Sequence, residues 1–290
     1  MSYSELNNGI KIPNIGIGTY LIKPVDAERS VKQALEMGYR LIDTAHIYSN
    51  EKAVGRAIKA SGVKREEIFV STKLWPTDYE NENAVEESLQ RLGLDYIDLL
   101  FLHQPGGNYM AGYKLLEKAY KEGKIKSIGI SNFEDYEGED EGKGKFMEEI
   151  LDHCEIIPQV IQSECHPYYT QEKLRKITEP KNIKLMSWFP LGQGDANLIN
   201  EPVFTELAKK YNKSNAQIIL KWHIQMGFLV IPGSKNVDHI RDNFNLFDFE
   251  LTDEDMTKIE AINKHKKYFQ KTVKIIEHMS KYLLPEEEED

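Results

Sequence analysis

The sequence predicts an α/β protein, a (β/α)8 TIM barrel with an N-terminal β-hairpin. Eight short apolar runs alternate with helical patterns along the 290 residues. The runs are apolar at nearly every position, as expected for parallel strands that are buried on both faces. Eight strand–helix units in one chain of this length favour a closed barrel. A doubly wound sheet is the rival architecture, but the glycines at 16 and 18 do not complete its Gly-x-Gly-x-x-Gly turn.

The chain opens with the predicted hairpin. Residues 3–16 read YSELNNGIKIPNIG, in which polar and apolar residues alternate around Asn8–Gly9. Asn-Gly favours the tight turn that joins two antiparallel strands. A hairpin placed before the first barrel strand is expected to plug one end of the barrel.

The predicted strands and their intervening helices follow in order. Helical spacing is clearest in residues 26–38, where the apolar residues fall on one face, and it recurs over residues 53–58 and 85–92. The expected strands are the apolar runs at residues 16–20, 40–45, 68–74, 97–103, 125–131, 158–164, 183–190 and 228–234.

Charge and composition argue against several classes of protein. A formal charge of −10 and a pI of about 5.4 disfavour nucleic acid and anionic membranes as partners. No apolar run approaches the ~20 residues that span a bilayer. The first residues, MSYSELNNGIK, lack the basic start and apolar core of a secretion signal.

The cysteine pattern indicates neither disulfides nor a metal site. Cys154 and Cys165 are the two cysteines of the chain, too few for a disulfide framework. Each neighbours a histidine, but the spacing of the two pairs fits no usual zinc site. We therefore expect a reduced, cytoplasmic protein without a metal.

Four polar side chains stand at or near the carboxyl ends of three consecutive predicted strands. Asp43 lies near the end of the second strand, and Tyr48 follows in the next loop. Lys73 lies in the third strand, and His103 ends the fourth. These strand ends gather at one face of a barrel, which is where such folds carry their chemistry. Taken singly, Asp43 also fits a helix cap, Tyr48 a packed phenol and His103 a structural histidine. A lysine in an apolar strand, however, is rare unless it is paired.

Together the four side chains suggest a proton donor. Lys73 supplies the cation that a buried Asp43 requires, and its ammonium is within plausible reach of Tyr48. A neighbouring cation favours phenolate and is expected to lower the pKa of Tyr48 from its usual value of about 10. His103 is placed to orient a substrate carbonyl or to share its proton. Such an acid needs a hydride source to reduce a carbonyl, and in proteins that source is usually a nicotinamide.

The chain resembles the aldo-keto reductases. Within that family it is similar to the bacterial-type aldehyde/ketone reductases and to diketogluconate-reductase-like members. The resemblance runs from about residue 5 to residue 263 through motifs in one order. They read GYRLIDTAHIYSNEKAVGRAI, STKLW, LGLDYIDLLFLH, GKIKSIGISNF, ECHPYYTQEKL, IPGS and NFNLFDFELTDEDM. The resemblance implies a barrel that reduces aldehydes and ketones with NADPH, less often NADH, and without metal. It also implies Tyr48 as the proton donor, with the other three strand-end side chains as its partners.

The resemblance assigns a nicotinamide-cofactor site to residues at the strand ends. Ser131, Asn132 and Gln162 match the positions that hydrogen-bond the carboxamide. Trp188 falls where an aromatic side chain stacks on the nicotinamide ring and so fixes the face that the substrate meets. Leu191 and Gly192 match the loop that crosses the pyrophosphate. The other assigned cofactor positions are Thr19, Asp43, Ser234, Lys235, His239, Asp242 and Asn243.

The adenosine end departs from the family pattern. Gly233 stands where the family usually has the lysine that binds the 2′-phosphate, and His239 stands where many members have arginine. Lys235 or Arg241 offers a replacement charge, since a phosphate needs cationic donors but not one fixed residue. We expect NADPH as the cofactor, with dual use or NADH as the alternative.

The substrate pocket departs from the pattern as well. Gln104 and Tyr20 occupy positions where well-known members have tryptophan, and Trp75 is the third expected pocket residue. A less aromatic and more polar pocket favours small or hydroxylated carbonyl substrates over large apolar ones. We expect a small-molecule carbonyl substrate, no nucleic-acid or membrane partner, and a monomer.

Two segments lie outside the matched motifs. The Gly- and Glu-rich residues 134–145 follow the fifth strand, so they form either a solvated acidic loop or a flap over the cofactor. After residue 264, TVKIIEHMSKYLL has helical spacing. In the family this tail often folds over the substrate pocket, and here it lies either there or outside the barrel. We expect one barrel domain over residues 1–290, in which residues 264–290 form a helical and acidic tail.

Other functions fit parts of the same site. It could chiefly oxidise a sugar or a secondary alcohol. It could also serve a cofactor-binding scaffold or sensor, although a scaffold has no need of a tuned phenol. Aldol cleavage through a Schiff base on Lys73 would require this lysine to be free of Asp43.

Overall fold

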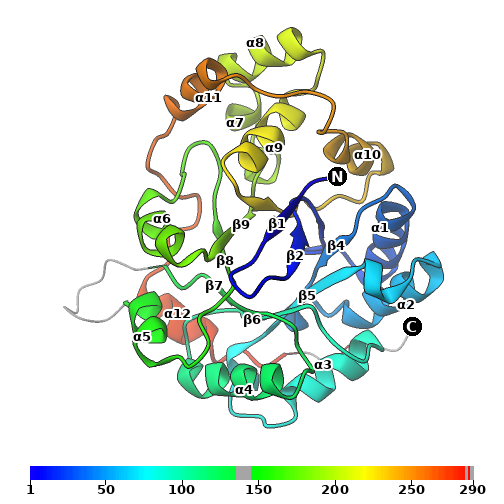
Figure 1. The fold of residues 1–290 in the computed structure, drawn as a ribbon, viewed down its shortest axis with the longest axis vertical. Coiled ribbons are helices and arrows are strands. Elements are labelled where there is room, and N and C mark those ends of the chain that lie inside the picture. The colour runs from blue at the N-terminus through cyan, green and yellow to red at the C-terminus, as the bar shows by residue number, and fades with distance from the viewer. Residues whose placement is uncertain (135–144, 285–286, 288–290) are drawn as a thin grey trace.

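A parallel sheet of eight strands forms the centre of the molecule (Figure 1). The computed structural model describes residues 1–134, 145–284 and 287. The strands follow one another in chain order across the sheet, and every neighbouring pair is parallel. They are β3 (Ile17–Gly18), β4 (Leu41–Asp43), β5 (Phe69–Leu74), β6 (Leu99–Leu102), β7 (Ile128–Ser131), β8 (Val160–Glu164), β9 (Lys184–Trp188) and β10 (Leu229–Val230).

Contacts between the first and last strands close the sheet. A parallel bridge joins Ile15 to Val230. The Gly16 amide donates to the Val230 carbonyl at 2.9 Å, and the Val230 amide donates to the Asn14 carbonyl at 3.0 Å. The predicted (β/α)8 barrel is therefore confirmed. All eight predicted strands are present, each shorter than its apolar run.

Helices surround the strands (Figure 1). In α1 the apolar stripe read from the sequence is buried, as Ala27, Val31, Ala34 and Leu35 pack toward the sheet. The helices are α1 (Pro24–Glu36), α2 (Glu51–Ser61), α3 (Ala84–Leu92), α4 (Tyr109–Lys121), α5 (Phe146–His153), α6 (Glu172–Thr178), α7 (Ala196–Ile199), α8 (Pro202–Tyr211), α9 (Asn215–Gln225), α10 (Val237–Phe244), α11 (Asp253–Glu260) and α12 (Val273–Met279). Short 3-10 turns are η1 (His46–Tyr48), η2 (Arg65–Glu67), η3 (Pro76–Asp78), η4 (Glu179–Lys181) and η5 (Gly192–Gly194).

The predicted hairpin plugs the barrel. Strands β1 (Tyr3–Glu5) and β2 (Lys11–Pro13) pair antiparallel, and Gly9 takes the positive φ of 84° that their turn requires. Leu6 and Ile12 share one buried cluster with the residues that begin several barrel strands. Those residues are Leu41, Phe69, Leu99, Val160 and Leu229. The hairpin thus closes the end of the barrel where the strands begin, and the opposite end is left for the site.

The C-terminal tail crosses that opposite end. The backbone amides of Tyr268 and Phe269 donate to the Glu164 carboxylate, which ends β8. Farther along, Ile276 of α12 and Ser280, which follows this helix, pack on Gly106 in the loop after β6. Of the two arrangements that the sequence allowed, the structure has the tail over the carboxyl ends of the strands.

Some expectations fall on residues that the structure does not describe. The loop at 134–145 lies outside the described residues except at its ends, and so does most of the acidic end at 285–290. Within the described ranges, no helix combines the length and apolar character that crossing a membrane would take.

Candidate active site

Four polar side chains meet at the carboxyl ends of the strands. Lys73 Nζ lies 2.6 Å from Asp43 Oδ2 and 5.1 Å from the centre of the Tyr48 ring. The Tyr48 and His103 ring centres are 5.7 Å apart. Strand geometry explains the meeting, because Asp43 pairs with Ser71 in register, and Lys73 points to the same face two residues later. The ion pair predicted from the sequence is thereby present.

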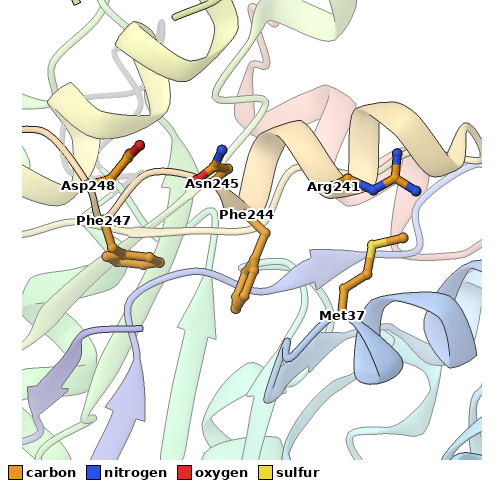
Figure 2. A pocket seen from close by; sticks show the side chains of 6 residues that line it. All are labelled: Met37, Arg241, Phe244, Asn245, Phe247 and Asp248. Atoms are coloured by element: carbon orange, nitrogen blue, oxygen red, sulfur yellow. The ribbon is translucent and has the colours of Figure 1, made fainter.

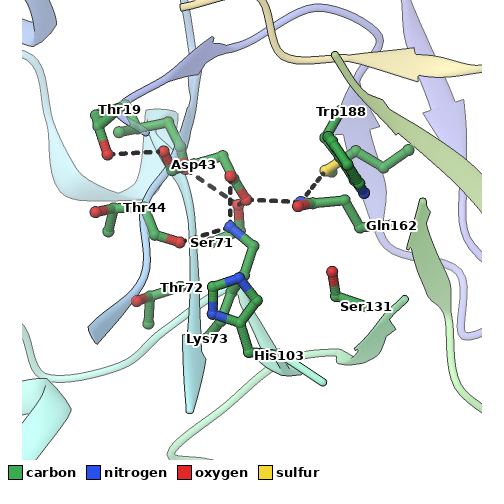
Figure 3. A network of polar contacts seen from close by, with 12 residues as sticks. Thr19, Asp43, Thr44, Ser71, Thr72, Lys73, His103, Ser131, Gln162 and Trp188 are labelled. Carbon is green, nitrogen blue, oxygen red and sulfur yellow. Dashed lines mark hydrogen bonds and ion pairs between the residues drawn. The ribbon is translucent and has the colours of Figure 1, made fainter. Parts of the chain in front are cut away.

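The ion pair is buried, and both partners make further hydrogen bonds (Figure 3). Asp43 Oδ1 accepts hydrogen bonds from Ser71 Oγ at 2.8 Å and Gln162 Nε2 at 2.9 Å. Lys73 Nζ also donates to the Thr44 carbonyl at 2.7 Å. Burial lowers the pKa of Lys73, while the charge and hydrogen bond of Asp43 oppose that shift. Removing either partner would leave an uncompensated charge in the interior.

The lowered pKa predicted for Tyr48 is wrong in direction. Burial of the phenol, followed by the negative charge of Asp43, raises the pKa of Tyr48 well above its usual value. The first physical reason is that burial removes the water that would solvate a phenolate, and the second is that Asp43 sits against the Lys73 ammonium and offsets the cation on which the prediction relied. Burial also lowers the pKa of His103 well below its usual range, assisted by the charges of Lys73 and Lys271. The structure therefore holds a protonated phenol beside a neutral imidazole.

The predicted carboxamide-binding residues stand on the next strands. Asn132 Nδ2 donates to the His103 carbonyl and to Ser131 Oγ, each at 3.1 Å. Trp188 Nε1 donates to Asn132 Oδ1 at 3.1 Å, and Gln162 reaches Asp43 as described above. Figure 3 shows Ser131, Gln162 and Trp188 on the side of the ion pair away from Thr19. The Asn132 backbone amide donates to the Gln162 carbonyl at 2.9 Å, so these hydrogen bonds connect the end of β4 to the end of β9.

The comparison with known proteins decides the family. The sequence pattern of the "Aldo/keto reductase family" matches residues 14–264. This chain belongs to that family. It is 45% identical over 265 residues to the glyoxal reductase of Bacillus subtilis, covering 90% of this chain and 92% of the relative. It is 42% identical over 268 residues to the 9,11-endoperoxide prostaglandin H2 reductase of Trypanosoma cruzi, with coverages of 90% and 92%.

Solved structures agree with this assignment. The crystal structure of MGS-M4, an aldo-keto reductase from a deep-sea metagenome library, superposes with a TM-score of 0.86 at 40% identity. The match covers 92% of this chain and 97% of that one. The chain is therefore an oxidoreductase of a family that reduces carbonyl compounds with nicotinamide cofactors.

The loop that the resemblance assigns to the cofactor pyrophosphate follows β9 directly. Gly192 has a positive φ of 58°, and an added Cβ would lie 3.0 Å from the Leu198 side chain, so this turn suits glycine. Leu191 precedes it and is partly buried against the core. The tail holds the same loop, because the Tyr268 hydroxyl donates to Asp195 Oδ2 at 2.5 Å.

The predicted adenosine positions lie together after β10. Ser234 Oγ accepts a hydrogen bond from the Asn236 amide at 3.0 Å, just before α10 begins. Lys235 is exposed, and its Nζ lies 4.0 Å from Asp26 Oδ2. Of the assigned residues on α10, His239 and Asp242 are exposed and Asn243 is buried. Thr19 directly follows β3 and is buried, and its amide donates to the Asp43 carbonyl at 3.0 Å.

Arg241 does not face this site. Its guanidinium donates to Asp238 at 2.6 Å and lines a surface hollow together with Met37 (Figure 2). Met37 ends the first helix, just before the chain enters β4, so the hollow lies toward the hairpin end of the barrel. Of the two residues that could replace the missing family lysine, Lys235 is therefore better placed than Arg241.

The predicted substrate residues surround Tyr48 and His103. The Tyr20 ring centre lies 5.2 Å from that of Tyr48, and the Trp75 ring meets His103 edge-on at 5.2 Å. Gln104 follows His103 directly and is buried. Trp75 Nε1 also donates to the Tyr282 carbonyl at 3.1 Å, so the tail borders the same rim.

Sequence reasoning missed the residues that the tail brings to the site. The Phe269 ring centre lies 5.2 Å from that of Trp188, and Lys271 reaches Gln104. Lys267 pairs with Glu134 at 2.8 Å. No local signal marks these residues, because their contacts connect positions more than 80 residues apart.

Neither cysteine joins a cluster of metal ligands in the described part of the chain. Cys165 is buried, and burial raises the pKa of its thiol. Its neighbour His166 contacts Glu164 through Nε2 at 3.0 Å. Cys154 follows α5.

Proposed function

We propose that this protein reduces aldehydes or ketones to alcohols, with hydride from NADPH and a proton from Tyr48. The observation that carries the proposal is the buried Asp43–Lys73 pair beneath a protonated phenol and a neutral imidazole. Similarity to a glyoxal reductase supports a small carbonyl substrate. Cytoplasmic location and a monomeric state remain predictions of this proposal.

The residues at the strand ends fit a nicotinamide cofactor. Ser131, Asn132 and Gln162 present hydroxyl and amide groups suited to a carboxamide, and Trp188 presents a half-buried aromatic ring. His103 Nδ1 is buried without a hydrogen-bond partner among the described residues, as expected where a ligand completes the site. When bound, the nicotinamide would supply hydride to the carbonyl carbon.

Side chains of the protein would supply the proton that the carbonyl oxygen of the substrate receives. Tyr48 begins protonated because its pKa is raised, and it gives its proton to the carbonyl oxygen as negative charge develops there. The phenolate that remains would lie beside the Lys73 ammonium, whose Nζ is 5.1 Å from the ring centre, and the Asp43 carboxylate offsets part of that attraction. Neutral His103 can donate one N–H hydrogen bond to the same oxygen, which orients the carbonyl.

NADPH is proposed despite the missing lysine at position 233. A side chain on Gly233 would bring its Cβ to 2.8 Å from the Gly18 carbonyl oxygen, so the backbone would have to move to admit a lysine here. Lys235 lies two residues farther on, exposed and before α10. We assign it the 2′-phosphate of NADPH, and use of NADH is the alternative.

Replacing Tyr48 with Phe tests the proposal. Turnover should fall about 100- to 10,000-fold, the usual contribution of a positioned acid. Cofactor affinity should stay within a few-fold, because the strand-end groups are untouched. Affinity is measured by quenching of tryptophan fluorescence on titration with NADPH and, separately, NADH, with Trp188→Phe showing which signal belongs to Trp188.

Each part of the proposal has its own contrary result. Full activity in Tyr48→Phe would exclude this phenol as the acid. Equal affinity for both cofactors would mean that the 2′-phosphate is not recognised. An absence of quenching and of turnover with either cofactor would contradict the reductase proposal as a whole.

A further inference from the structure

A lysine from the tail reaches the rim of the proposed substrate pocket. Lys271 Nζ lies 3.4 Å from Gln104 Oε1 and 5.9 Å from the centre of the Trp188 ring. Its charge is the smallest of the three causes that lower the pKa of His103, after burial and Lys73, so the ammonium lies near that imidazole. Lys271 comes from the segment between Phe269 and α12, far along the chain from the barrel strands.

The carboxylates around Lys271 are already engaged by other groups. Glu134 pairs with Lys267 at 2.8 Å and accepts a hydrogen bond from Ser163 at 2.8 Å. Glu164 accepts hydrogen bonds from two tail amides and contacts His166. Among the described residues, none forms an ion pair with Lys271, and its hydrogen bond to Gln104 is long.

An unpaired, partly buried ammonium is costly, and this one lies beside Gln104 and Trp188, at the rim of the proposed substrate pocket. Burial lowers the pKa of Lys271, with Lys267 adding to that shift and the two glutamates opposing it. A bound anion would restore the solvation that burial removes. The two glutamates disfavour a dianion, so a carboxylate suits the site better than a phosphate ester. The two oxygens of a carboxylate could also take a second hydrogen bond from the Gln104 amide.

We propose that Lys271 is a specificity residue that selects carbonyl substrates bearing a carboxylate, an inference that rests on the proposed reductase function. The carboxylate binds between Lys271 and Gln104, and the carbonyl lies toward Tyr48 and His103. Lys271 acts on substrate binding and takes no part in proton transfer.

The test compares acids with neutral aldehydes of the same length. The series runs from glyoxylate to 5-oxopentanoate, each with the unsubstituted aldehyde of equal carbon number. We expect the wild-type enzyme to favour at least one acid of the series over its aldehyde. Lys271→Met should lower kcat/KM for that acid roughly 10- to 100-fold, mainly through KM, as loss of a charged hydrogen bond does. Neutral aldehydes should change less than about twofold, and Lys271→Arg should retain most of the preference.

Lys266→Met is the matched control, since this lysine lies in the same segment but its side chain is exposed. It should leave the preference for the acid unchanged. An equal loss for acids and aldehydes in Lys271→Met, or weaker NADPH binding, would overturn the inference by assigning Lys271 to the cofactor or the fold. An unchanged preference in Lys271→Met would overturn it as well. Both results leave the reductase function standing, whereas no reduction of any substrate by the wild type would overturn both proposals.

Discussion

Burial decides the charge of the two side chains that would face the substrate. A free imidazole titrates near pH 6.5 and a free phenol near pH 10. In this protein burial moves the pKa of His103 down and that of Tyr48 up, because each side chain loses water that would solvate its charged form. The neutral forms of both groups are thereby stabilised across the whole range between these two values.

This arrangement predicts that neither His103 nor Tyr48 causes a rise or fall of kcat/KM with pH in the range between their ordinary pKa values. Between about pH 6.5 and pH 10, kcat/KM should show no ionisation of His103 or Tyr48. Lowering the pH protonates His103 only well below 6.5, and raising it ionises Tyr48 only above 10. The checks are the pH dependence of kcat/KM and an ultraviolet titration of wild type against Tyr48→Phe. An acid limb near pH 6.5 that vanishes in His103→Gln, or phenol ionisation below pH 10, would contradict the prediction.

The same residues show which part of the site the sequence could predict. A lysine in an apolar strand needs a counter-charge, and this local argument found the Asp43–Lys73 pair. The direction in which the pKa of Tyr48 shifts from its ordinary value could not be predicted in this way. It depends on how much water the folded chain removes from the phenol and on how closely Asp43 neutralises Lys73, and both are set by packing between distant segments.

Among the elements, the barrel strands were predictable and the course of the tail was not. Buried parallel strands are apolar throughout, so each leaves a run in the sequence. The helical spacing of α12 says only that one face is apolar, and it cannot say which surface that face meets. The helix α12 packs on Gly106, a residue without a side chain, and no local sequence pattern distinguishes this glycine as a packing partner.

Gly106 therefore provides a test of the tail. A methyl group at this position would overlap the Ser280 hydroxyl and lie 2.9 Å from Ser280 Cβ. Gly106→Ala should displace the end of α12 at a cost of about 1–3 kcal/mol, as overpacking does. The measurement is the rate of tryptic cleavage at the exposed Lys281, which should rise.

A double variant separates the clash from other effects. Gly106→Ala combined with Ser280→Gly lacks Ser280 Oγ and Cβ, the two atoms that collide most closely, so it should be cleaved at nearly the rate of Ser280→Gly alone. Additive effects of the two changes would show that a side chain at position 106 does not meet Ser280.

Over the whole molecule, the two ends of the barrel have separate tasks. The hairpin end is packed with apolar side chains from the hairpin and from the starts of the strands. The opposite end carries the buried charges and the tail. Stability and chemistry should therefore respond to different substitutions, as expected for barrels whose chemistry lies at the carboxyl ends of the strands.

Leu6→Ala tests this division. Leu6 is 1% exposed and packs inside the barrel mouth, so its truncation should lower the free energy of unfolding by about 2–5 kcal/mol. Tyr3→Ala, on the exposed face of the same hairpin, should change it by less than about 0.5 kcal/mol. Urea unfolding measures both, and kcat/KM of the folded Leu6→Ala enzyme should match that of the wild type. A stability loss no larger than that of Tyr3→Ala would mean that the hairpin is not a plug, and a fall in kcat/KM would mean that the two ends are coupled.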